Sequence, residues 1–284
     1  MKLRTFDRLI KGQATSDGAG VRLKRTLGQT PFSRLDPFLM LDEFRSDDAA
    51  DYIAGFPAHP HRGFETVTYM LAGRMRHEDH LGNRGVIEGG GVQWMTAARG
   101  IIHAEMPEQE SGLMHGFQLW LNLPAEEKMK DPAWRDIPAH DVPVTSSGDV
   151  SVTVIAGEFG AVRGAVSGVS TDPLYLDVRL APDAEFELPL ADVRNACAYS
   201  YLGELRNSAG GHPKVEAGVL GVFGKGDGVR LQAGGEGASF LLLAARPLNE
   251  PVVQYGPFVM NTQEEIEQAL TDYRSGRFGR DGGV

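Results

Sequence analysis

The sequence predicts an all-β protein made of two barrels in tandem, with few helices. Thirty-six glycines and 16 prolines divide the 284 residues into many short runs rich in Val, Thr, Tyr, Phe and Leu. Runs of this kind, bounded by frequent turn residues, are typical of antiparallel β-structure. The second half of the chain also repeats the pattern of the first. A hydrophobic content of 42% suffices for packed cores at this length.

The first predicted barrel is clearest between Phe64 and Met106, where strand-like runs alternate with short turns. The runs and turns, in order, are FETVTYML, the turn at Gly73, RMRHEDHL, the turn GNRG, VIEGGG, VQWMTA, the turn ARG, and IIHAEM. Because barrels and sandwiches bury one strand face and remove open edges, this spacing indicates one of those two shapes.

Residues 125–148 change the composition of the chain: they are polar, contain prolines and lack a period of two. We interpret them as a linker over the surface and place the domain boundary near Thr145. The predicted domains are residues 1–140, which would bind metal, and residues 146–284.

The second domain resembles the first in its turn and strand pattern. The stretch KGDGVRLQAG from Lys225 is similar to GGGVQWMTAARG from Gly89, and FLLLAARP from Phe240 takes the place of IIHAEMP. Two copies of one barrel fit this repeat. The second copy has leucines where the first has His and Glu, and its one histidine, His212, lies in a Gly-rich turn. We therefore expect metal ligands in the first domain only.

One helix is predicted near the end of the chain. Thr262 and Glu265 have the spacing of a capping box, and Gly276 can end the helix. The apolar residues that share one face of this helix are Ile266, Ala269, Leu270 and Tyr273. We expect this helix to pack on a sheet and to carry no chemistry.

The charge pattern excludes several classes of partner. Acidic residues outnumber basic ones by 38 to 28, giving a net charge of −10. The basic residues are scattered, so direct binding to nucleic acid, which needs a basic face, is not expected. The chain shows neither the apolar core of a signal peptide nor the run of about 20 apolar residues that crosses a bilayer. With Cys197 as its lone cysteine, the protein is expected to be cytoplasmic and monomeric.

Two short segments predict a metal site. Residues i and i+2 of a strand point to the same side, so His59 and His61 share one face, and so do His103 and Glu105. The two pairs would converge if their strands faced each other across the interior of a small barrel. Burying four such groups without a partner costs several kcal/mol. One divalent cation would satisfy all four.

Glu65 offers an alternative to Glu105, because it lies four residues after His61 and on the same face of a regular strand. A bulge at Gly63 would change that register. Glu65 would then be solvated or paired with an arginine such as Arg62.

Other polar and aromatic residues near these segments have weaker signals. We expect His77 and His80 to be solvated, because they lie with acidic residues beside a turn. Gln118 and Trp120 lie on an alternating strand that could line the same interior.

Imidazoles with one carboxylate and no thiolate suit Fe, Mn, Ni, Cu or Zn better than Mg or Ca, and Fe(II) is our first choice. Four protein ligands leave two positions of an octahedron for water, dioxygen or a chelating substrate. Such a site can be catalytic, and a purely structural or vestigial site is the alternative.

Several long motifs resemble the pirin family of the cupin superfamily. They are FPAHPHRGFETVTYMLAG, HEDHLGNRG, GGVQWMTAARGIIHAEMP, HGFQLWLNLP with EEKMKDP after it, and QYGPFVMNTQEEI. The resemblance covers nearly the whole chain. It implies two tandem cupin barrels with a metal, usually iron, in the first. Carried over to this sequence, the metal ligands are His59, His61, His103 and Glu105, which disfavours Glu65.

The resemblance also implies two kinds of function. Some pirins oxygenate the flavonol quercetin with O2. On this interpretation the chain is a dioxygenase of a small aromatic substrate. Glu105 would be the base that accepts the flavonol hydroxyl proton if its carboxylate loosens from the metal. Other pirins are described as nuclear cofactors of transcription factors, switched by the redox state of iron. The alternative is therefore a metal- or redox-sensing regulatory protein that binds a protein partner.

Overall fold

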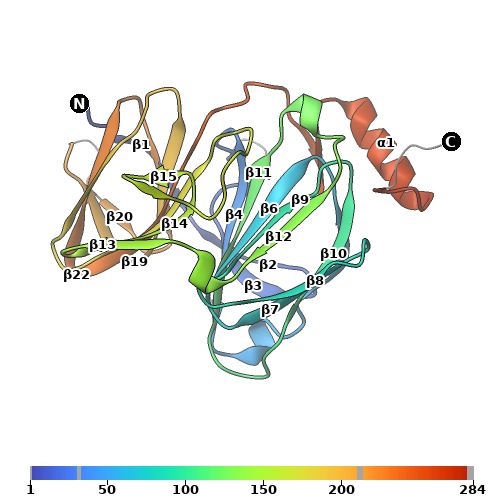
Figure 1. Cartoon of the computed structure of the whole chain (residues 1–284), viewed down its shortest axis with the longest axis horizontal. Coiled ribbons are helices and arrows are strands. Elements are labelled where there is room, and N and C mark those ends of the chain that lie inside the picture. The colour runs from blue at the N-terminus through green and yellow to red at the C-terminus, as the bar shows by residue number, and fades with distance from the viewer. Residues whose placement is uncertain (1, 31–32, 210–213, 280–284) are drawn as a thin grey trace. The chain divides into compact units, whose positions relative to one another are not determined.

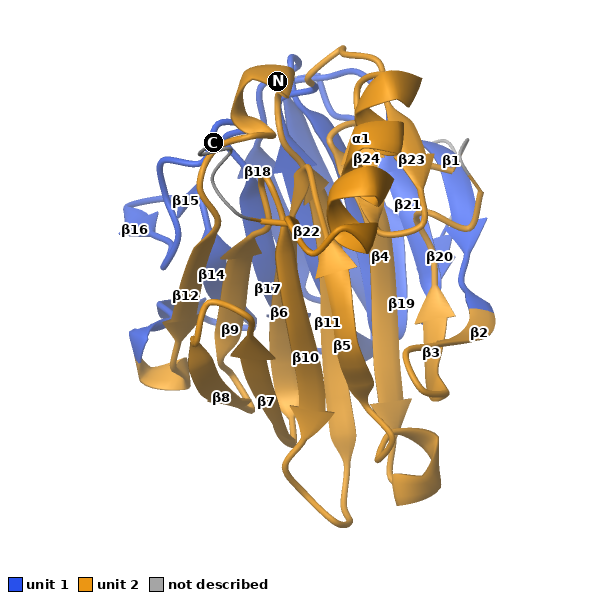
Figure 2. Cartoon of the chain, turned by 90° about the vertical axis from the view of Figure 1, so that its right-hand side faces the viewer, with its two compact units in different colours: residues 1–13, 141–247 blue, residues 14–140, 248–284 orange. Residues whose placement is uncertain are grey.

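The computed structural model describes residues 2–30, 33–209 and 214–279. The chain forms two compact units, which Figure 2 shows in different colours. Unit 1 contains Met1–Gln13 and Asp141–Pro247, and unit 2 contains Ala14–His140 and Leu248–Val284. His212 lies outside the described residues.

Unit 2 contains a seven-stranded sheet with the order β12-β9-β6-β11-β4-β3-β2. Its strands are β2 (Gln13–Asp17), β3 (Val21–Arg25), β4 (Phe38–Ser46), β6 (Phe64–Ala72), β9 (Val92–Thr96), β11 (Met114–Asn122) and β12 (Ala133–Ile137). The central strands β6 and β11 are largely buried, including polar residues such as Glu65 and Thr68.

A four-stranded sheet, ordered β5-β10-β7-β8, belongs to the same unit. Figure 1 labels β7, β8 and β10, and Figure 2 shows all four strands in the colour of unit 2. Its strands are β5 (Phe56–His61), β7 (Arg74–Asp79), β8 (Arg84–Glu88) and β10 (Ile101–Pro107). The short strands β23 (Val253–Tyr255) and β24 (Phe258–Met260) form a separate pair. The remaining elements are the 3-10 turns η1 (Ala49–Asp51), η2 (Ala125–Glu127) and η3 (Ala139–Asp141), and the helix α1 (Gln263–Arg274).

Unit 1 is built on a nine-stranded antiparallel sheet with the main order β1-β21-β19-β22-β17-β14-β13. The strands of this unit are β1 (Phe6–Lys11), β13 (Val144–Ser147), β14 (Val150–Ala156), β15 (Glu158–Phe159), β16 (Val162–Arg163), β17 (Leu174–Leu180), β18 (Glu185–Pro189), β19 (Asn195–Asn207), β20 (Lys214–Glu216), β21 (Val219–Phe223) and β22 (Gly228–Ala245). Alternate residues of β14, β17 and β22 form one apolar core.

The prediction of an all-β chain with a C-terminal helix is confirmed. The strands predicted between Phe64 and Met106 are present as β6 to β10. The capping box is also present, since the Thr262 hydroxyl accepts a hydrogen bond from the Glu265 backbone and the Glu265 side chain accepts one from the Thr262 backbone. Cys197 is buried.

The linker prediction for residues 125–148 is wrong in part. β12 pairs with β9 along five residues, and β13 pairs with β14. Both are short edge strands, which explains why their sequence lacks the alternation of a half-buried strand. The segment therefore extends two sheets.

The two units also differ from the contiguous division expected from the sequence. β1 at the start of the chain pairs with β21, so it belongs to unit 1. Residues 248–284, with α1, belong to unit 2. Cross-strand pairing joins segments that are remote in sequence, and local composition does not report it. Among the described residues, the structure has no helix that is both long enough and apolar enough to span a bilayer.

Candidate metal centre

The two histidine segments are neighbouring strands of one sheet. β5 and β10 form an antiparallel pair in which His103 lies opposite His59 and Ile101 lies opposite His61. Our prediction that they face each other across an interior is therefore wrong. Side chains directly opposite in an antiparallel pair lie about 5 Å apart at Cβ, so adjacent strands can bring these imidazoles together.

The three histidines form a cluster of metal-binding size. The Nε2 atom of His59 lies 2.9 Å from Nε2 of His61 and 3.0 Å from Nε2 of His103. One ring nitrogen from each histidine can be chosen so that all three lie within 4.8 Å of one another. Among the described residues this is the one group of three or more potential ligands that could hold a metal ion.

These separations fit neighbouring ligands of one ion. Two nitrogens bound at 90° with metal–nitrogen bonds of about 2.1 Å would lie about 3 Å apart. The Nδ1 atom of His59 lies 2.8 Å from the carbonyl oxygen of Pro57. A proton on Nδ1 donated to that carbonyl leaves the Nε2 lone pair of His59 directed at the other two rings.

Burial favours the neutral form of the three imidazoles. His61 and His103 are 2% and 1% exposed, and desolvation lowers the pKa of each well below its usual value. Desolvation also lowers the pKa of His59. Neutral imidazoles carry the lone pair that a metal needs. The donor set therefore fits a divalent transition ion.

Glu105 lies beside this group but is not a member of it. Its Oε1 atom accepts a hydrogen bond from Thr68 Oγ1 at 3.0 Å, and its Oε2 atom accepts one from Gln118 Nε2 at 3.2 Å. The pairing of β5 and β10 shifts register between His103 and Glu105, where Glu105 lies opposite Phe56. Desolvation raises the pKa of this buried carboxyl to about 7.

His77 is a residue of this region that the sequence analysis misjudged. We expected it to be solvated, but it is fully buried. It lies opposite Glu105 in the pairing of β7 with β10. Strand alternation was the signal that could have found it, because the apolar Met75 is buried on the same face. His80, by contrast, is exposed as expected.

Glu65 is hydrogen-bonded to Thr96, a partner that the sequence analysis did not predict. It lies on β6 and is 3% exposed, and its Oε1 accepts a hydrogen bond from Thr96 Oγ1 at 2.6 Å. Arg62 donates to Asp272 at 2.8 Å and to the Arg99 carbonyl at 2.6 Å. Glu65 is thus neither solvated nor paired with Arg62.

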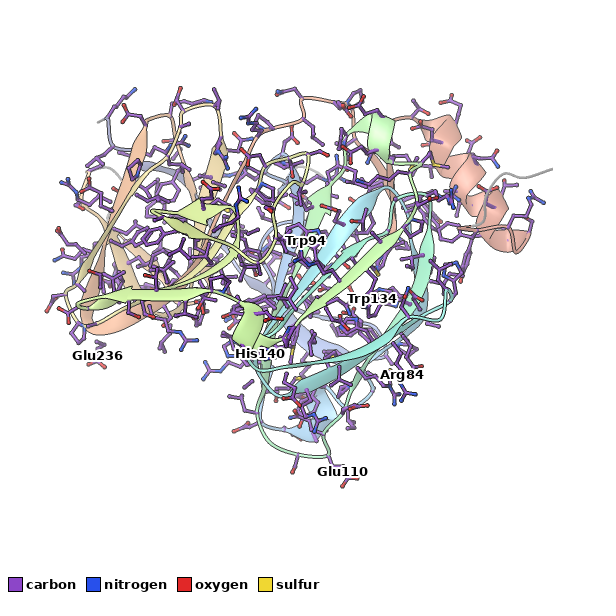
Figure 3. The ribbon with its side chains drawn as sticks, viewed as in Figure 1. Arg84, Trp94, Glu110, Trp134, His140 and Glu236 are labelled. Atoms are coloured by element: carbon purple, nitrogen blue, oxygen red, sulfur yellow. The ribbon has the colours of Figure 1, made fainter. Side chains whose placement is uncertain are left out.

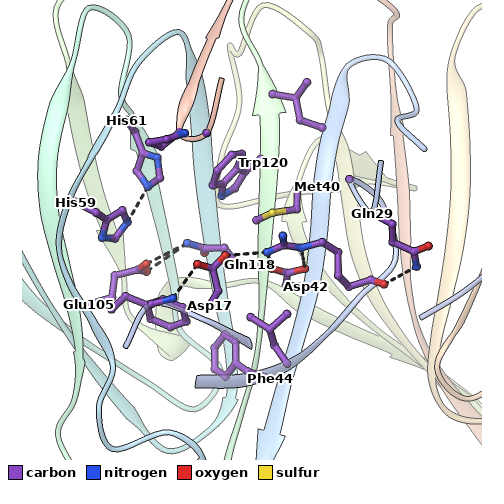
Figure 4. A pocket seen from close by; sticks show the side chains of 18 of the residues that line it. Asp17, Gln29, Met40, Asp42, Phe44, His59, His61, Glu105, Gln118 and Trp120 are labelled. Atoms are coloured by element: carbon purple, nitrogen blue, oxygen red, sulfur yellow. Dashed lines mark hydrogen bonds and ion pairs between the residues drawn. The ribbon is translucent and has the colours of Figure 1, made fainter. Parts of the chain in front are cut away.

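The histidine group borders a cavity of about 780 Å³ within unit 2. His59, His61 and Glu105 line one end of it, and the cavity continues past Trp120 and Met40 toward Gln29 (Figure 4). Further apolar lining comes from Leu23, Leu39, Phe44 and Phe56. Gln118 and Trp120, on the strand that the sequence allowed to line this interior, both border the cavity.

The C-terminal helix covers the opposite face of β10. Ile102 packs against an apolar cluster that contains Ile266 and Ala269 of α1. Arg62, next to His61, makes the ion pair with Asp272 of the same helix. These contacts attach α1 to β10 at Ile102 and to Arg62, directly after the end of β5, on the side away from the histidine group.

Comparisons with known proteins agree over nearly the whole chain. Residues 20–121 match the pirin family, and residues 175–279 match the pirin C-terminal cupin domain. A Pseudomonas aeruginosa protein named "Putative quercetin 2,3-dioxygenase" is 54% identical over 94% of this chain and 95% of its own length. A pirin-like protein of Caulobacter vibrioides is 52% identical over 98% of this chain and all of its own length.

A solved structure is similar to this chain over nearly its whole length. The crystal structure of quercetin 2,3-dioxygenase from Acinetobacter baumannii has a TM-score of 0.89 and 31% sequence identity. The match covers 98% of this chain and 99% of that chain.

Proposed function

Because the chain belongs to the pirin family, we propose that it is a metal-dependent dioxygenase that acts on flavonols such as quercetin with O2. The observation that carries this proposal is the position of the three-histidine group at one end of a largely apolar cavity. The dioxygenase names of similar proteins also support it. The cytoplasmic location and the monomeric state stay predictions from the sequence.

In this proposal His59, His61 and His103 hold the metal, with Glu105 as the fourth ligand. Fe(II) is our first choice, and Mn, Ni, Cu and Zn are alternatives with the same ligand preference. When bound, the ion would supply a positive charge and open coordination positions for a chelating substrate and O2.

The cavity suits a flat aromatic substrate. Pockets for small molecules are commonly about 300 to 1,000 Å³, with apolar walls and a few polar groups. Here Trp120, Phe44 and Met40 provide apolar surface, and Gln118 provides a polar group beside Glu105. We assign Glu105 as the base that accepts the proton of the flavonol hydroxyl.

Quercetin oxidation by protein of known metal content tests the proposal. Protein purified without a tag is analysed for metals, loaded with Fe(II), and mixed with quercetin in air and without oxygen. We expect the visible band of quercetin to disappear only when both metal and O2 are present. His103→Ala should abolish this loss, whereas His140→Ala, at an exposed residue that Figure 3 labels, should not. No oxygen-dependent change at any metal loading would contradict the proposed activity.

A further inference from the structure

His77 is a fully buried imidazole that lies beside Glu105. Its Nε2 atom lies 3.4 Å from Glu105 Oε1. Among the described residues, neither of its ring nitrogens meets the geometric limits of a hydrogen bond. A buried polar group without a hydrogen bond lowers the free energy of unfolding by about 1–3 kcal/mol, so a buried imidazole is expected to have a hydrogen-bond partner.

His77 lies among apolar side chains and beside Glu105. The ring of Trp134 packs edge-on against His77 at a centroid distance of 5.6 Å, and Ile87 and Met75 on the same sheet are buried and apolar (Figure 3 labels Trp134). Glu105 is the one carboxylate within 4 Å of a His77 ring nitrogen in the part of the chain described. A small shift of either side chain that shortens this contact and straightens its angle would form a hydrogen bond.

His77 is not placed to join the histidine group itself. It is not a member of the three-residue cluster, and its ring centroid lies 6.2 Å from that of His103. Any action of His77 on a bound metal therefore passes through Glu105.

Glu105 already has two donors on other strands. Thr68 of β6 and Gln118 of β11 donate to its carboxylate. Both belong to the seven-stranded sheet, whereas His77 and Glu105 belong to the four-stranded sheet. A hydrogen bond from His77 on β7 would add a third donor to Glu105, this one from the same four-stranded sheet as Glu105. Partners that orient ligands in this way are common around protein metal sites.

We propose that His77 is a positioning residue that donates its Nε2 proton to Glu105 Oε1 and, with Thr68 and Gln118, fixes the carboxylate beside the metal-binding histidines. The proposal rests on the role given to Glu105 in the proposed function. It adds to the four proposed ligands a residue that acts on metal binding without contacting the metal.

Three variants separate this role from a purely structural one. His77→Phe keeps a ring but removes the donor, His77→Gln keeps an N–H donor, and His140→Gln is a matched change on the surface. The readouts are the Kd for Mn(II), measured by calorimetry, and the EPR spectrum of Cu(II)-loaded protein. We expect His77→Phe to weaken metal binding about 10- to 100-fold and to change the EPR spectrum. His77→Gln should recover most of the affinity, and His140→Gln should behave as wild type.

A double-mutant cycle tests whether His77 acts through Glu105. In a Glu105→Ala background, His77→Phe should cause little further loss of affinity, because the acceptor is gone. An equal loss in both backgrounds, or wild-type affinity in a folded His77→Phe protein, would overturn the proposal. If the Phe variant does not fold, 15N NMR of wild-type histidines decides, with the His77 signals assigned from the Gln variant. A proton on Nε2 supports the proposal, and a proton on Nδ1 overturns it.

The same measurements distinguish failure of the two proposals. If the protein binds metal in a way that depends on His77 but does not oxidise quercetin, the proposed function is contradicted and the role of His77 is not. No metal binding by the wild-type protein would overturn both.

Discussion

His59 and His103 lie directly opposite each other on the antiparallel strands β5 and β10, and their Nε2 atoms are 3.0 Å apart. The geometry of the histidine group therefore depends on the register of a single strand pair. A shift by one residue would turn one histidine pair to the other face of the sheet.

Metal binding should stabilise the protein through these histidines. At a free metal concentration of about 100 times Kd, a ligand that binds only the folded state adds about 2.7 kcal/mol to the free energy of unfolding. We expect Mn(II) or Zn(II) to raise the Tm of the wild type and of His140→Ala, but not that of His103→Ala. Differential scanning calorimetry with and without chelator measures this. An equal metal-induced shift in His103→Ala would rule out the assigned site.

Replacing Glu105 by Gln should remove its charge while keeping its shape and an oxygen acceptor for Thr68. We expect kcat for quercetin oxidation to fall by about 10²- to 10⁴-fold, because a proton acceptor is lost. Steady-state kinetics and metal analysis of the same samples measure the effect. Glu110→Gln, at an exposed position (Figure 3), is the control. Unchanged kcat in Glu105→Gln would exclude Glu105 as the base.

Adding bulk to the cavity wall should block the substrate without disturbing the metal. Met40 lines the cavity, so Met40→Trp should raise KM for quercetin by about tenfold, equivalent to about 1.4 kcal/mol. Metal content should stay at the wild-type level. Met129→Trp, at a residue 52% exposed, provides the control. If both variants give the same KM as wild type, the substrate does not bind in this cavity.

The buried Lys128 should produce a distinctive dependence of stability on pH. Its Nζ donates to the Gly63 carbonyl at 2.6 Å, to Asn122 Oδ1 at 2.6 Å and to the Val259 carbonyl at 3.0 Å. Desolvation lowers its pKa from 10.5 to about 8. Between those values the unfolded chain binds more protons than the folded protein, so this group makes stability rise with pH.

Urea unfolding of wild type and Lys128→Met at several pH values measures this effect. Between pH 8 and 10.5 the free energy of unfolding of the wild type should rise relative to that of Lys128→Met by up to about 3 kcal/mol. It should stay constant below pH 7. Lys130→Met, at a side chain 42% exposed, should show no such trend. A constant difference for Lys128→Met across the whole range would contradict a lowered pKa.

The sequence predicted those parts of the site that depend on spacing within one strand. His59 with His61, and His103 with Glu105, follow from the rule that alternate residues share a face. The cavity residues Gln118 and Trp120 followed from the same alternation on β11. The C-terminal helix followed from its capping box, since all the groups involved lie within four residues.

The sequence failed where a residue's surroundings come from another strand. His77 was interpreted as solvated because acidic residues lie next to it in the chain, yet pairing of β7 with β10 buries it opposite Glu105. Glu65 was given Arg62 as a partner because the two are close in sequence, but its partner, Thr96, is on β9.

The sequence by itself determined the all-β class, the positions of most strands in the first half, and which side chains share a strand face. Only the tertiary structure decided that β5 and β10 are neighbours, that His77 lies beside Glu105, and that the ends of the chain belong to different units. The physical reason is that alternation and capping involve residues a few positions apart. Strand order and register instead depend on hydrogen bonds and packing between distant segments.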